Sequence, residues 1–165
     1  DNVSVPSANM IGELNKGWPI VAKTLEKATI AKCAEMVGGM QAVLDMSVAY
    51  AKERVQYGRP IGSYQAIQHM LADMFIRVGM SKNILYEAAW MISEGLPATG
   101  KLATAKGFCN EAYKKVTVDG VEVHGAIGTT RDHDMGLYYR RAIVADSTFG
   151  DTESQREAVA IELGL

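Results

Sequence analysis

Three long stretches of the sequence repeat apolar residues at steps of three and four positions, and short breaks rich in glycine and proline separate them. These steps are typical of amphipathic helices that bury one face. The first stretch predicts a helix over about 17–56, and Gly38-Gly39 within it predicts a close contact with another helix rather than a break. Its expected buried face comprises Cys33, Met36, Val37, Met40, Val43, Leu44 and Ser47.

The remaining periodic stretches predict four more helices. The second begins after Gly62 with Ser63 as its N-cap and ends near 95–97; the third spans about 98–124. Shorter helices are expected over 133–145 and 152–163, the last capped by Asp151 or Thr152. Strand patterns are nearly absent, so we predict an all-α, up-and-down four-helix-bundle-like domain over 17–165 with short extra C-terminal helices. The expected buried positions of the second and third helices are Tyr64, Ile67, Leu71, Met74, Phe75, Val78, Leu85, Ala88 and Ile92, then Leu102, Ala105, Cys109, Ala112, Val116 and Val123.

Composition narrows the class of protein. The chain has 165 residues, 48% of them hydrophobic, and a formal net charge of -2, so one domain without a field for nucleic acid is expected. No apolar run reaches the roughly 20 residues that span a bilayer. Cys33 and Cys109 fall on apolar helix positions, which favours buried free thiols and a cytoplasmic location. The chain opens without a signal peptide or Met, so we expect a piece of a longer protein.

The break between the first two helices gathers polar side chains at a helix end and the next helix start. They include Arg54, Gln56, Tyr57 and Gln65. Arginine grips phosphate with two parallel hydrogen bonds, and a helix N-terminus adds free N–H groups and partial positive charge. The segment is therefore either a site for an anionic cofactor or an ordinary capped turn with a surface arginine.

Two other clusters carry weaker predictions. The acidic and histidine residues between Glu122 and Asp134 lack both Glu-x-x-His and His-x-x-x-His spacing, so no metal site is expected. The Gly-rich segment 125–130 follows a helix rather than a strand. It can be a helix C-cap, which the spacing favours, or backbone that approaches a ligand closely.

Four blocks of the sequence resemble the C-terminal domain of the acyl-CoA dehydrogenase family of flavoproteins, and they follow one another in the order found in that family. The resemblance extends over essentially the whole chain, and 1–16 is similar to the tail of the family's middle β-domain or the linker after it. The matching blocks are Asn9–Trp18, Arg54–Gly62 with Gln65–His69, Val123–Thr130 and Leu137–Ala142.

The resemblance implies an FAD-dependent enzyme that dehydrogenates acyl-CoA thioesters, passes electrons to an electron-transfer acceptor, and assembles as a homo- or hetero-oligomer, dimer or tetramer, through this domain. It implies that Arg54 grips the FAD pyrophosphate of a neighbouring subunit, and that Thr152 and Ser154 contact the subunit's own FAD. The other cofactor contacts that it implies are Gln56, Tyr57, Gln65, Glu122, Val123, Gly125 and Ala126.

The sequence departs from the family where the catalytic base is expected. The two usual glutamate positions match Gly150 and Ala28, and neither side chain can accept a proton. Asp151 is adjacent to the first position, but a helix N-cap is the more ordinary role for it. Glu122 stands where the family commonly has Gln. The ending resembles a divergent branch with heteromeric members, so the alternatives are a non-catalytic partner subunit or interaction module, or a flavin oxidase or monooxygenase. In every case we expect the fragment alone to be inactive.

Overall fold

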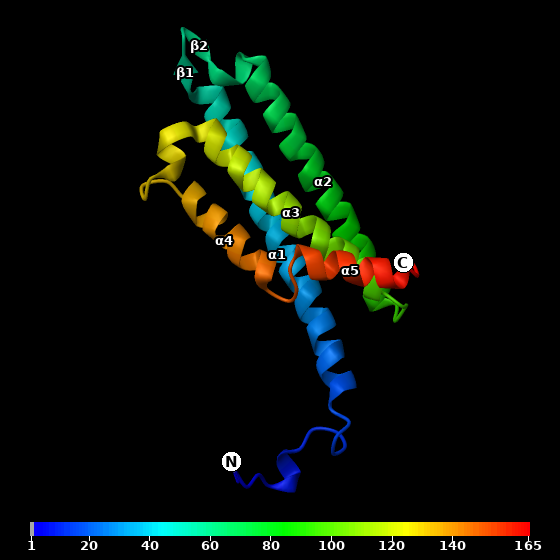
Figure 1. Cartoon of the computed structure of the whole chain (residues 1–165). Coiled ribbons are helices and arrows are strands. Elements are labelled where there is room, and N and C mark those ends of the chain that lie inside the picture. The colour runs from blue at the N-terminus through cyan, green and yellow to red at the C-terminus, as the bar shows by residue number, and fades with distance from the viewer. Residues whose placement is uncertain (1) are drawn as a thin grey trace.

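The computed structural model describes residues 2–165 and shows an elongated helical bundle (Figure 1). Helix α3 is central, because it packs against each of the other four helices. The all-α prediction is confirmed. The helices are α1 (Trp18–Glu53), α2 (Gln65–Ser93), α3 (Thr99–His124), α4 (Met135–Ser147) and α5 (Thr152–Glu162), with short 3₁₀ segments η1 (Ser7–Asn9), η2 (Ile61–Ser63) and η3 (Gly125–Thr129).

The predicted core faces of α1 and α3 are confirmed, since every position named for them is buried. On α2 the prediction is wrong for Phe75, whose side chain is 69% exposed. The buried face of α2 runs through Met74, Val78, Leu85 and Ala88, and the 100° step per residue turns Phe75 to the outside. The methionines at positions 36, 40, 74 and 135 fill the core, as the sequence indicated.

The first helix ends three residues earlier than predicted because a hairpin begins there. Strands β1 (Val55–Gln56) and β2 (Arg59–Pro60) pair antiparallel around Tyr57 and Gly58, both in the left-handed region at φ 52° and 82°. Sequence reasoning missed this hairpin, because two-residue strands leave no periodic pattern. Ser63 is not the N-cap of α2: Tyr64 occupies that position, and the Ser63 hydroxyl donates to the Pro60 carbonyl.

Two finer predictions about the helices are confirmed. Helix α1 continues through Gly38-Gly39, and a Cβ on Gly39 would collide with the ring and hydroxyl of buried Tyr113 on α3. Asp151 caps α5, since its side chain accepts a hydrogen bond from the Ser154 amide at 2.8 Å.

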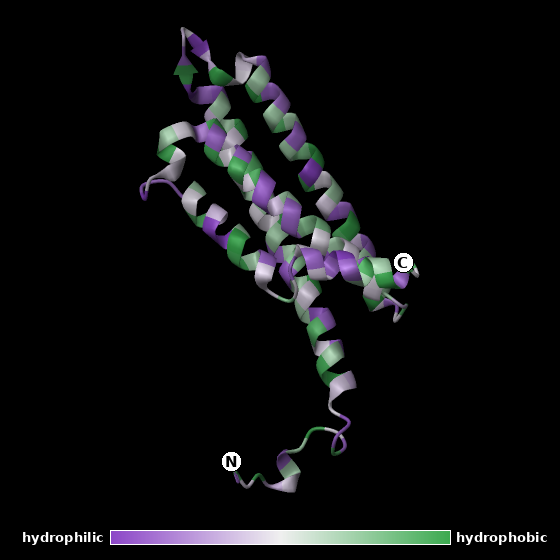
Figure 2. Ribbon diagram, viewed as in Figure 1, coloured by the Kyte–Doolittle hydropathy of each residue, from purple (hydrophilic) through white to green (hydrophobic). Residues whose placement is uncertain are grey.

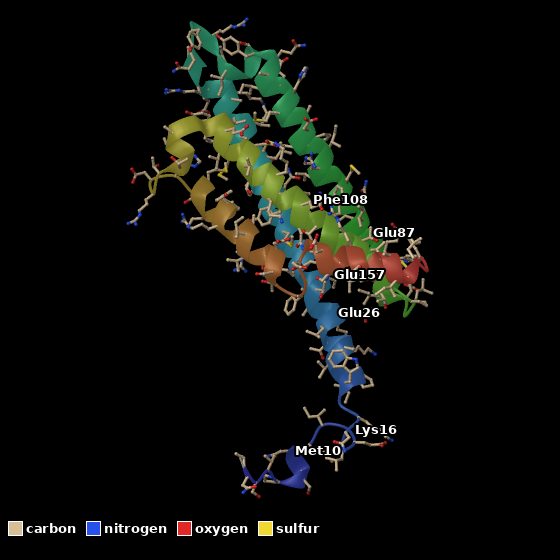
Figure 3. The ribbon with its side chains drawn as sticks, in the orientation of Figure 1. Met10, Lys16, Glu26, Glu87, Phe108 and Glu157 are labelled. Atoms are coloured by element: carbon tan, nitrogen blue, oxygen red, sulfur yellow. The ribbon has the colours of Figure 1, made fainter. Side chains whose placement is uncertain are left out.

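The start of α1 extends past the other helices (Figure 1). Residues 2–17, with Met10 and Lys16, extend away from the bundle and are exposed (Figure 3). Cys33 and Cys109 are buried free thiols within the bundle. None of the helices in residues 2–165 combines the length and apolar character needed to cross a membrane.

Candidate functional site

A groove of about 430 Å³ lies at the hairpin end of the bundle. Its walls come from the end of α1, the hairpin, the start of α2 and the α3–η3 junction. The two blocks predicted to hold a cofactor, one around Arg54 and one around Gly125, therefore meet in space although about 70 residues separate them in the chain. The lining residues are Tyr50, Arg54, Gln56, Tyr57, Ile61, Tyr64, Ile67, Glu122, Val123, His124, Gly125 and Ala126.

Backbone hydrogen bonds on both sides fix the position of Arg54. Its amide donates to the Tyr50 carbonyl at 2.8 Å, and its carbonyl accepts from the Ile61 amide at 2.8 Å. The Tyr64 hydroxyl donates to the Gln56 carbonyl at 2.9 Å and ties the hairpin to the start of α2. Arg54 thus lines the groove from a backbone that hydrogen bonds hold on both sides.

Within residues 2–165, the charged side chains of the groove form no ion pairs. None of the ion pairs within residues 2–165 includes Arg54 or Glu122. By contrast, the neighbouring Arg59 stacks over the Tyr64 ring, 4.1 Å from its centroid. An exposed guanidinium that contributes to no internal pair can bind an anion at little structural cost.

Aromatic rings form the floor of the groove. The ring of buried His124 stacks on Tyr50 with centroids 4.6 Å apart, and His133 lies 4.6 Å away on a tilted plane. His124 Nδ1 is 2.7 Å from the Gly120 carbonyl, and burial lowers the pKa of His124. Burial therefore favours the neutral form of His124 where it lines the groove. Within residues 2–165 no group of three or more His, Cys, Asp or Glu side chains could hold a metal ion.

The Gly-rich segment acts as a helix cap. Gly125 ends α3 at φ 65°, and its amide donates to the carbonyls of Val121 and Glu122. This confirms the C-cap interpretation. No atom lies within 4 Å of the place where a Cβ on Gly125 would stand, so the backbone here is open to the groove. Close approach to a ligand remains a prediction.

Three of the predicted cofactor residues do not line the groove. Gln65 is the exposed first residue of α2, next to groove-lining Tyr64. Thr152 and Ser154 lie at the start of α5, toward the opposite end of the bundle (Figure 1). Thr152 Oγ1 donates to Asp146 Oδ1 at 2.9 Å. The candidate cofactor residues therefore form two separate surfaces.

Sequence reasoning missed the apolar part of the groove. Tyr50, Ile61, Tyr64 and Ile67 line it together with His124. Tyr50 and Arg54 are four residues apart, so helical spacing offered one signal that both lie on the same face. The hairpin that folds Ile61 and Tyr64 over them had no such signal.

Ala28 and Gly150 are the two positions that the resemblance matches to the family's catalytic base, and this assignment remains a prediction. Ala28 is half-buried on α1, and Gly150 lies in the α4–α5 turn at φ 102°. The carbonyl of Gly150 accepts a hydrogen bond from Lys106. The pKa of Asp151 is lowered chiefly because the Ser154 amide donates to its carboxylate, which makes Asp151 a weaker base.

The helices around this groove form a domain known from a family of flavoproteins. Residues 15–164 match the family model "Acyl-CoA dehydrogenase, C-terminal domain", and the chain belongs to that family. It is 36% identical over 163 residues to the probable acyl-CoA dehydrogenase YngJ of Bacillus subtilis, covering 99% of this chain and 43% of that protein.

Solved structures agree with this assignment. Butyryl-CoA dehydrogenase from Megasphaera elsdenii superposes with a TM-score of 0.94 at 32% identity, over 98% of this chain and 42% of the other. A structure described as PigA with FAD and proline gives a TM-score of 0.96 at 25% identity, over 100% and 43%. The chain thus spans less than half the length of the relatives that it matches.

Proposed function

We propose that this chain is the FAD-binding and oligomerising domain of an enzyme that dehydrogenates acyl-CoA thioesters between the α and β carbons. The groove that joins Arg54 to the Gly125 segment carries the proposal. The Arg54 guanidinium, which forms no ion pair within residues 2–165, and the open backbone at Gly125 suit a pyrophosphate, which needs charge-assisted donors and close approach. FAD bound there would supply the hydride acceptor of the reaction.

The chain's own residues would divide the work between two surfaces. Arg54 would pair with the pyrophosphate of a neighbouring subunit's FAD, while Gln56 and Gln65 offer amide groups and Tyr57 offers an aromatic face that is 94% exposed. The backbone of 123–126 would approach the same cofactor. At the start of α5, Thr152 and Ser154 would contact the subunit's own FAD.

Exposed apolar surface supports assembly with other subunits. Figure 2 shows apolar residues recurring along the part of α1 that extends past the bundle. Helix α2 also carries apolar side chains on its outer face, which is unusual for a surface left in water. The exposed residues are Trp18, Ile20, Val21 and Leu25 on α1, and Phe75, Ile76, Met80, Tyr86 and Trp90 on α2.

An external acceptor would reoxidise the flavin. Support comes from a relative named as a subunit of a caffeyl-CoA reductase–Etf complex. An electron-transferring flavoprotein would receive the electrons from the assembled enzyme.

The absence of a carboxylate at Ala28 and Gly150 favours a second candidate, a partner subunit of a heteromeric dehydrogenase. Residues 147–149 are Ser, Thr and Phe, so a register shift toward α4 within this turn supplies no carboxylate, and a shift the other way reaches Asp151, which caps α5. In this arrangement the groove still holds FAD, and the proton acceptor lies in another domain or in the partner subunit.

Replacing Arg54 tests the cofactor site. In the longest natural form of the protein, Arg54→Ala should release FAD about tenfold or more readily, because a charge-assisted hydrogen bond contributes about 1.5–3 kcal/mol. Flavin absorbance after dialysis measures retention. Arg59→Ala is the matched control, since Arg59 stacks on Tyr64 in the same hairpin. Equal retention in the Arg54 variant and the unmodified protein would refute the proposal, and enoyl-CoA as product would confirm the reaction class.

A further inference from the structure

Lys106 is a wholly buried lysine that the proposed function does not use. Its side chain is 0% exposed within α3. The ammonium lies 2.6 Å from Asn110 Oδ1, 2.9 Å from the Gly150 carbonyl, 3.1 Å from the Ala145 carbonyl and 3.3 Å from the Asp146 carbonyl. A buried charge is tolerated when hydrogen bonds replace water, and this oxygen cage does so.

The three carbonyls of the cage also accept longer hydrogen bonds, from the Thr148 amide to Ala145 at 3.3 Å and from Asn110 Nδ2 to Asp146 and Gly150 at 3.4 Å. The carbonyls of Ala145 and Asp146 belong to the last turn of α4, where helical hydrogen bonding ends and partial negative charge collects. The third carbonyl, of Gly150, lies in the turn itself, after Phe149 at φ 60°. One ammonium therefore joins α3, the end of α4 and the turn leading into α5.

No carboxylate hydrogen-bonds to Lys106 within residues 2–165; its partners are three carbonyls and one amide oxygen. Asp146 instead bonds through its side chain to Thr152 and forms an ion pair with Lys114 at 3.1 Å. Burial lowers the pKa of Lys106, while the four neutral oxygens around Nζ supply the acceptors that a charged ammonium needs. A packing role alone would not need this charge.

We propose that Lys106 is a positioning residue: its ammonium holds the α4–α5 turn in the shape that presents Thr152 and Ser154. The inference rests on the proposed function only where it takes these two residues as flavin contacts. The geometry of the cage itself is independent of that assignment.

Chemical rescue separates charge from packing. In the full-length protein, Lys106→Met keeps the unbranched side chain up to Cε and removes the ammonium, and Lys106→Ala leaves room for a small ammonium ion. Lys101→Met is the matched control, because Lys101 lies half-buried near the start of α3 and pairs with Glu87 on α2 rather than with the turn. Hydrogen exchange at the Ser154 and Gln155 amides, which bond to Asp151, reports the turn without reference to flavin.

We expect Lys106→Met to speed exchange at these amides about tenfold or more, the scale of one lost charge-assisted bond, with the control unchanged. Propylammonium should restore slow exchange to Lys106→Ala, whereas tetramethylammonium, which cannot donate, should not. Normal exchange in Lys106→Met, or equal rescue by both ions, would overturn the proposal.

If neither Lys106 variant folds, Asn110→Ala and Asn110→Asp decide the matter together. Both remove the hydrogen bonds from Asn110 Nδ2 to the Asp146 and Gly150 carbonyls at 3.4 Å, but only Asn110→Ala removes the oxygen that accepts from Lys106. Faster exchange at the same two amides in Asn110→Ala than in Asn110→Asp supports the cage, and equal exchange in the two refutes it. Flavin retention measured on the same samples tests the second step. Loosened exchange with normal retention would uphold the cage and refute the assignment of Thr152 and Ser154 to the cofactor.

Discussion

The hairpin end and the α4–α5 turn of this bundle each depend on a basic residue, but they use its charge in opposite ways. At the hairpin end, Arg54 is exposed and contributes to no ion pair within the described chain. At the turn, Lys106 is buried and surrounded by oxygens of its own chain. A charge satisfied internally builds structure, whereas a charge left outside on a rigid backbone is available to a ligand.

The contrast extends to the glycines at the two places. Gly125 caps α3 beside the groove, and a Cβ added there would have no neighbouring segment within 4 Å. Gly150 is enclosed, because a Cβ there would meet the side chains of Gln155 and Ser154. The hairpin end thus leaves its backbone accessible, and the turn fills the equivalent space with its own atoms.

The packed middle of the bundle gives the largest expected effect and tests whether the two ends are independent. Gly39→Ala should lower the free energy of unfolding, because overpacking against Tyr113 costs about 1–3 kcal/mol and exceeds the roughly 1 kcal/mol gained from helix propensity. Gly38→Ala, with no atom within 4 Å of its new Cβ, should be stabilising. Urea unfolding measures both. If the ends are independent, FAD retention should be normal in the folded Gly39 variant; strong flavin loss would couple the middle to the groove.

A change within the groove gives a smaller effect that sharpens the account of its charge. Glu122 lines the same groove as Arg54, where a carboxylate repels a pyrophosphate. Glu122→Gln should therefore tighten FAD binding about two- to fivefold, as expected for a solvent-screened charge. Titration with FAD at low and high salt measures this gain, which should shrink as salt increases. Glu94→Gln, at the end of α2, is the control, and weaker binding in the Glu122 variant would contradict the assignment.

The importance of Arg54 could be predicted from the sequence and that of Lys106 could not, for a physical reason. Arg54 could be singled out because Gly58, Pro60 and Gly62 break the helical pattern directly after it, and local punctuation is visible in a sequence. Lys106 could not, since its carbonyl partners are 39–44 residues away and are brought near only by packing. The apolar faces of α1 and α3 were predictable from their spacing. The exposure of Phe75 depended on which neighbours α2 meets.

The smallest expected effect concerns Asp151, the one carboxylate next to the expected base position. Its side chain accepts the Ser154 amide at 2.8 Å as the N-cap of α5, and this bond lowers the pKa of Asp151. Because the folded-state pKa is lowered, the cap stabilises the protein above the ordinary value of 3.8 and loses that contribution as the pH falls below it. We therefore expect this carboxylate to stabilise the turn, as Lys106 does, rather than to accept the substrate proton.

Asp151→Asn keeps an oxygen for the cap and removes the base. A general base contributes about 10²–10⁴-fold to a rate, so a loss of only a few-fold in kcat, measured in the full-length protein with flavin and assembly intact, would leave the proton acceptor in another domain or subunit. A loss of about 10²-fold or more would make Asp151 the base. That result would contradict the contrast between the hairpin end and the turn, because a residue of the turn would then take part in the reaction.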